Sequence, residues 1–117
     1  MFITSAESMH RSYLLTIASG EALSAILNTA NIAVGAILLP ATWTAANLTV
    51  QGSIDGTNFF NVYDQFGGEV TITASASAIA QMGMADLWTI QYLRFRSGTA
   101  GTPVNQAGAR ILTVLCR

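Results

Sequence analysis

The stretch from residue 48 to residue 64, LTVQGSIDGTNFFNVYD, decides the fold class of this chain. Its first half alternates, because Leu48 and Val50 share one side of an extended backbone and the polar residues beside them take the other. A second β-favouring run follows the step from Asp55 to Gly56. Glycine readily supplies the positive φ that turns require, so the pattern predicts a β-hairpin with these two residues at its tip.

Outward from this hairpin, the chain is a series of short β-favouring runs separated by turn residues. Its last run is apolar on both sides, which favours a central position in a sheet. Residues 22–28 also contain good helix formers, and we interpret them as a strand because they are short and lie between turn signals. The sequence predicts an all-β fold, a two-sheet antiparallel β-sandwich that is jelly-roll-like. About eight strands are expected, at residues 12–18, 22–28, 32–39, 48–54, 58–64, 69–75, 88–97 and 109–116. Residues 76–87 show no clean period, and a short strand with a loop is expected there.

The first eleven residues show no strand or helix period, which predicts an N-terminal arm or lead-in at 1–11 before a single domain at 12–117. The arm's apolar residues Phe2, Ile3 and Met9 are too sparse to define a core face. Ordering such a segment costs about 1–2 kcal/mol of backbone entropy per residue. We therefore expect a neighbouring protein to order the arm through these three residues.

Charge is scarce: 9% of the 117 residues are charged and 51% are apolar, against a typical charged share of about 25%. All five basic residues are arginines, and interface cores are enriched in Arg and depleted in Lys and Glu. This composition predicts a homo-oligomer. The formal net charge of −1 argues against nucleic-acid and membrane-surface binding. No stretch has the length of a membrane span or the pattern of a signal peptide, so we expect synthesis in the cytoplasm.

Few residues could carry out catalysis. The single histidine, His10, lies in the lead-in, and the single cysteine, Cys116, lies in an apolar run and is interpreted as a core residue. Among the carboxylates, Asp55 with Asp64 or Glu69 could form a glycosidase pair or a calcium site, but turn roles explain both aspartates. We expect no enzyme activity, no metal, no cofactor and no small-molecule substrate.

Two groups of side chains remain as candidate contact residues. Arg94 and Arg96 share one face of the strand predicted at 88–97, where they could contact a partner protein or pair with Glu69 or Asp86. Three aromatic residues could instead stack on sugar rings, which would make the chain a carbohydrate-binding module. These residues are Trp43, Trp88 and Tyr63.

The last three-quarters of the chain resembles small virion proteins of tailed bacteriophages. The matching segments are LPATWTAANL at 39–48, SIDGTNF at 53–59, YD at 63–64 with GG at 67–68, LRFRSGT at 93–99 and PVNQAGAR at 103–110. The resemblance implies a capsid cement or decoration protein on the exterior of the virion. Such proteins are commonly trimers that clamp neighbouring major capsid subunits, and they offer no catalytic residues to carry over. Two alternatives remain: the carbohydrate-binding module could belong to a phage fibre or tail, or the chain could be another head–tail or tail component.

Overall fold

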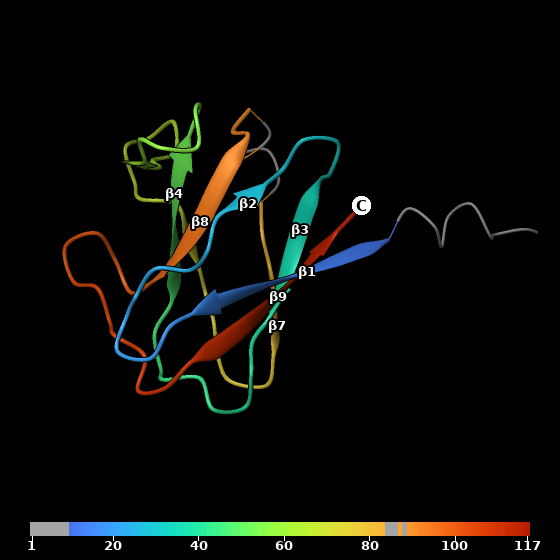
Figure 1. The fold of residues 1–117 in the computed structure, drawn as a ribbon. Helices are drawn as coiled ribbons and strands as arrows, with labels where there is room; N and C mark the ends of the chain where they lie inside the picture. The colour runs from blue at the N-terminus through green and yellow to red at the C-terminus, as the bar shows by residue number, and fades with distance from the viewer. Residues whose placement is uncertain (1–9, 84–86, 88) are drawn as a thin grey trace, which may run out of the picture.

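The computed structural model describes residues 10–83, 87 and 89–117. These residues form nine β-strands and no helix, and the strands make two antiparallel sheets (Figure 1). The predicted all-β sandwich is therefore confirmed. Of the predicted arm at 1–11, Phe2, Ile3 and Met9 lie outside the described residues, and Arg11 is already the first residue of a strand.

One sheet has four strands and the other has five. The four-stranded sheet runs in the order β1 (Arg11–Ile17), β9 (Arg110–Cys116), β3 (Val34–Leu38) and β7 (Ile79–Gln81). The five-stranded sheet runs in the order β2 (Leu27–Asn28), β8 (Tyr92–Ser97), β4 (Leu48–Ser53) and β5 (Phe60–Asn61), with β6 (Thr71–Ile72) also paired to β4.

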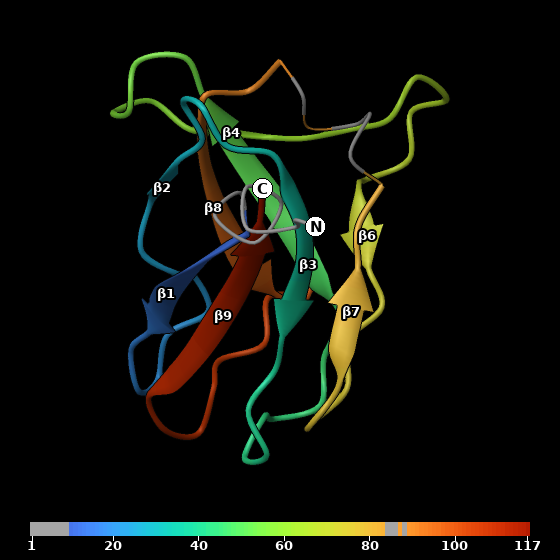
Figure 2. The same cartoon turned by 90° about the vertical axis from the view of Figure 1, so that its right-hand side faces the viewer.

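The strand order is that of a jelly roll. Strands early in the chain pair with strands late in it: β1 with β9, β2 with β8, and β3 with both β7 and β9. The chain changes sheet at every connection except those between β4, β5 and β6. Figure 2 shows the result, with β1, β9, β3 and β7 in the near layer and β8 and β4 behind. This arrangement leaves each sheet one face for the shared core and one face for the outside.

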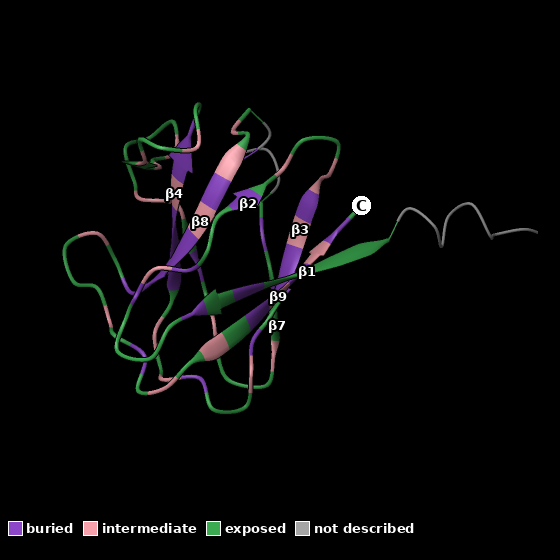
Figure 3. Ribbon diagram, in the orientation of Figure 1, coloured by how far each residue is buried: buried purple, intermediate pink, exposed green. Residues whose placement is uncertain are grey.

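The core forms where the alternating apolar residues of both sheets meet. Buried and less buried residues alternate along most of β9, as the period of two requires, whereas β4 is buried over most of its length (Figure 3). β9 is central, as predicted, because it lies between β1 and β3. The fully buried apolar side chains are Ile17, Ile37, Leu48, Val50, Leu93, Phe95, Leu112 and Val114.

Three predicted strands are much shorter than expected. Residues 22–28 contribute only β2, and residues 58–64 and 69–75 contribute only the two-residue strands β5 and β6. The predicted hairpin forms, since β4 pairs with β5, but its connection is longer than a two-residue turn because Gly52 faces Phe60. Gly56 has a φ of +81° in this connection, as a turn glycine should.

Candidate interface surfaces

Asp55 organises the connection between β4 and β5. Its Oδ1 accepts hydrogen bonds from the backbone amides of Thr57 and Asn58, each at 2.8 Å, and its Oδ2 accepts one from the Asn58 side chain at 2.8 Å. The Ser53 hydroxyl donates to Oδ1 at 2.9 Å. These donors, with the Asn58 amide first, hold the pKa of Asp55 well below its usual range. The carboxylate is therefore committed to the loop itself.

The outer face of the five-stranded sheet carries a paired polar network around Arg96. The Arg96 guanidinium donates to Glu69 Oε2 at 2.6 Å, to Asn61 Oδ1 at 3.1 Å and to Thr49 Oγ1 at 3.0 Å. Glu69 also accepts from the Ala100 amide at 3.1 Å. Arg96 is only 5% exposed. The predicted pairing with Glu69 is present, and Arg96 is too deeply buried for the partner contact that the sequence suggested.

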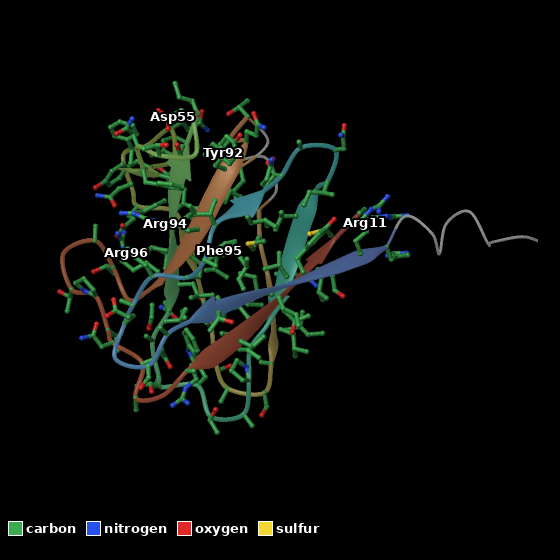
Figure 4. The ribbon with its side chains drawn as sticks, in the orientation of Figure 1. Arg11, Asp55, Tyr92, Arg94, Phe95 and Arg96 are labelled. Carbon is green, nitrogen blue, oxygen red and sulfur yellow. The ribbon has the colours of Figure 1, made fainter. Side chains whose placement is uncertain are left out.

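Arg94 lies two residues earlier on the same face (Figure 4). Its Nε donates to Gln51 Oε1 at 2.7 Å, and its guanidinium carbon lies 4.3 Å from the centre of the Phe59 ring. That distance is within the range of a cation–π interaction. Arg94 is half-buried, and its guanidinium is also engaged by neighbours within this face. Tyr92 lies two residues before Arg94 in β8 and therefore on the same face, and its ring lies against Gly56.

Of the predicted sugar-binding residues, Trp43 and Tyr63 are not brought together. Trp43 is buried in the core and donates its indole N–H to the Ala46 carbonyl at 3.0 Å, so it is a core residue and its assignment as a sugar platform is wrong. Trp88 lies outside the described residues. Tyr63 is exposed and lines a groove of about 310 Å³ together with Phe60, Val62 and Ile90. We call this the loop groove. Sequence reasoning missed Phe60 as a groove residue. The signal was the pair of adjacent phenylalanines at 59–60, because neighbouring residues of a strand point to opposite sides.

A larger surface, which sequence reasoning missed, is the outer face of the four-stranded sheet. Register and burial together show which residues point outward from it, because residues opposite each other in a ladder share a face. One row crosses all four strands: Leu14, Thr113, Leu38 and Ile79. The other outward residues are Ser12, Thr16, Ile111, Leu115, Ala36 and Gln81. We call these residues the sheet face, and none of them is charged.

The residues considered for catalysis lie apart from one another or are engaged. His10 is exposed at the start of β1. Cys116 is buried at the end of β9, and burial raises the pKa of its thiol, which disfavours the reactive thiolate. Within the part of the chain that the structure describes, His, Cys, Asp and Glu form no group of three or more that could hold a metal ion. Nor do those residues include a helix that is long and apolar enough to cross a membrane.

No protein-family model, curated protein or solved structure matches this chain. The resemblance to virion proteins of tailed phages stays a prediction. Function is therefore argued below from the surfaces of the sandwich, above all from the sheet face.

Proposed function

We propose that this chain is a non-enzymatic virion structural protein, a capsid cement or decoration protein that clamps neighbouring major capsid subunits on the outside of the particle. One observation carries the proposal: an entire outer sheet face, four strands wide, is free of charged residues. An exposed antiparallel sheet face normally alternates polar residues outward. A wide uncharged face is typical of a surface that is covered in an assembly.

The way the chain uses its polar groups also supports a role based on contact. The carboxylate of Asp55 accepts hydrogen bonds from its own loop, and that of Asp64 accepts two from the amides of Phe66 and Gly68. The carboxylate of Glu69 accepts from the Arg96 guanidinium and from the Ala100 amide. Within the described residues, every buried side-chain nitrogen and oxygen atom has a partner. These carboxylates therefore serve as structural acceptors.

The segments that resemble phage proteins occupy structural positions in the fold. Gln106, from the PVNQAGAR segment, is fully buried and accepts from the Thr44 amide at 2.8 Å. Its side-chain amide donates to the Thr44 carbonyl at 3.0 Å and to the Ser97 hydroxyl at 2.8 Å. Hydrogen bonds of Gln106 thus join three of the resembling segments: 39–48, 93–99 and 103–110. Buried residues of this kind support a sandwich fold in common with the virion proteins that the segments resemble. The contact role that we propose depends on the surfaces.

The test is to locate the chain in particles of the phage whose genome encodes it. Electron cryomicroscopy of wild-type particles, and of particles lacking the gene, gives a difference map of the protein. We expect density on the capsid exterior where capsomers meet. Difference density on the tail would instead favour the head–tail or tail component, and its absence from the whole particle would overturn the proposal.

A second candidate function is carbohydrate binding at the loop groove. The groove places the exposed residues Phe60 and Tyr63 beside the polar residue Thr89, which is a combination that sugar sites use. A glycan array probed with the purified protein tests it. Binding that is lost in Tyr63→Ala and kept in Phe66→Ala would support this function, because Phe66 is exposed but does not line the groove. An array without binding would exclude the glycans it displays.

A further inference from the structure

We propose that the sheet face is the surface through which this chain binds a second copy of itself. The inference deepens the proposed function, on which it rests for the biological setting, by naming a second copy of the chain as the partner that covers this face in the assembly. It concerns the purified protein and can fail separately. It starts from the register of the four-stranded sheet, which aligns Leu14, Thr113, Leu38 and Ile79 in one continuous row. Ile111 and Leu115 extend the apolar area along the central strand β9.

The charge distribution selects the kind of partner. The arginines near this sheet, Arg11, Arg110 and Arg117, lie at the ends of its strands or just beyond them, and the sheet face between them carries none. A nucleic acid or a strongly acidic protein would therefore find positive charge only at the rim of the face and none across its centre. A second neutral, apolar face is the complementary surface, and another copy of the chain supplies it.

The exposed apolar area of the sheet face is large enough to contribute to a protein interface. Leu14, in the middle of the edge strand β1, is 67% exposed, and Ile79, the first residue of the edge strand β7, is 55% exposed. With Leu38 and Ile111 they expose on the order of 400 Å² of apolar surface, which equals the largest patch of a typical monomer. The surrounding Ser, Thr and Gln residues bring the face toward the roughly 800 Å² that each partner contributes to a standard interface.

The shape of the face also suits a second copy. A hollow of about 510 Å³ opens at the rim of the face, where β1 begins and β9 ends, and His10 and Arg117 line it together with Ala36, Gln81 and Leu115. Leu14 protrudes elsewhere on the same face. A protrusion and a hollow on one surface allow reciprocal contacts between two copies, because each residue pair then occurs twice about a two-fold axis.

The experiment measures the molar mass of the purified full chain by light scattering, at concentrations from 1 to about 100 µM. We expect the wild type to have a multiple of its 12.3 kDa chain mass. The variants Leu14→Glu and Ile79→Glu should each shift the midpoint of dissociation at least tenfold higher, because two copies would bring like charges together in an apolar contact. Phe66→Glu is the matched control: Phe66 is 88% exposed on a loop of the other sheet and should leave the mass unchanged.

Circular dichroism of each variant shows whether the sandwich still folds, and Thr113→Arg replaces any face variant that does not. Thr113 lies at the centre of the row and points outward. A wild type that remains a monomer throughout the range overturns the inference. So does a wild-type oligomer whose mass survives all three face substitutions, and if Phe66→Glu alone dissociates it, the loops form the interface.

Particle binding separates this inference from the proposed function. A monomeric wild type that still decorates phage heads would overturn self-association and leave the cement role standing. An oligomer that dissociates in the face variants but is absent from every particle would support self-association and overturn the cement role.

Discussion

Removing the Glu69 carboxylate is the sharpest test of how the five-stranded sheet is held together. Glu69 receives the Arg96 guanidinium at 2.6 Å and also accepts from the Ala100 amide. The side chains of Arg96 and Glu69 are only 6% and 16% exposed, so solvent screens their interaction weakly. Glu69→Ala would leave a buried guanidinium without its counter-charge and the loop at Ala100 without its acceptor.

The expected cost follows from that burial. Breaking a buried ion pair by removing one partner costs about 3–5 kcal/mol. Arg96 keeps its hydrogen bonds to Thr49 and Asn61, which places Glu69→Ala at the lower end of this range. A domain of this size loses about 4 °C of melting temperature per kcal/mol, so Glu69→Ala should lower Tm by roughly 12 °C. Glu69→Gln keeps an acceptor and loses the charge, and should lower Tm by about half as much.

Thermal and urea unfolding followed by circular dichroism measure these changes. Glu21→Gln is the control, since Glu21 is exposed and should shift stability by less than about 0.5 kcal/mol. Adding Arg96→Met to Glu69→Ala completes a double-mutant cycle, which should show a coupling energy of about 1–3 kcal/mol. A coupling near zero, or a Glu69→Gln variant that melts with Glu21→Gln, would refute the argument that this pair fastens β8 to the loops.

Four further predictions concern the turn, pH, the thiol and metal ions. Gly56→Val should lose about 1–3 kcal/mol in urea unfolding, because φ is +81° and a Cβ would lie 3.4 Å from the Tyr92 ring, whereas Gly101→Val, in open space, should not. The pKa of Asp55 is lowered in the folded state, so its ionised carboxylate stabilises the fold above its ordinary pKa of about 3.9, and this stabilisation is lost as the pH falls further. Asp55→Asn should therefore make Tm fall less steeply in acid. Cys116, buried and with a raised pKa, should react with iodoacetamide far more slowly when folded than in urea, as mass spectrometry can show. A chelator should leave Tm unchanged, and a large drop would revive the calcium site considered at Asp55.

The sandwich could be predicted from the sequence because period-two alternation is a local signal. It placed β4, β8 and β9 within a few residues of their observed bounds, and the inward residues of β8, Leu93 and Phe95, are fully buried as their spacing requires. The strands β5 and β6 were overpredicted. Near them Asp55 and Asp64 draw backbone amides into turns, and such side-chain acceptors compete with the ladder.

The candidate surfaces were harder to predict because they depend on which distant segments meet. Spacing placed Arg94 and Arg96 on one face, but nothing local indicates that Thr49 and Glu69 cover Arg96. The apolar pattern on both sides of β9 was interpreted as a central position in a sheet. The strand is indeed central, yet Ile111 remains half exposed because no layer of the described residues covers the outer side.

The two outer faces of the sandwich together explain the low charge of the chain. On the five-stranded sheet, both outward arginines are engaged within the same chain. Arg94 contacts Gln51 and Phe59, and Arg96 pairs with Glu69. The four-stranded sheet carries no charge on its outer face at all. A surface kept permanently in water gains from charged side chains, whereas a surface destined for burial loses by them, since each buried charge needs a partner. The shortage of charge is therefore concentrated on the surface that we expect an assembly to bury, and restoring it there with Leu14→Glu should separate the copies without unfolding them.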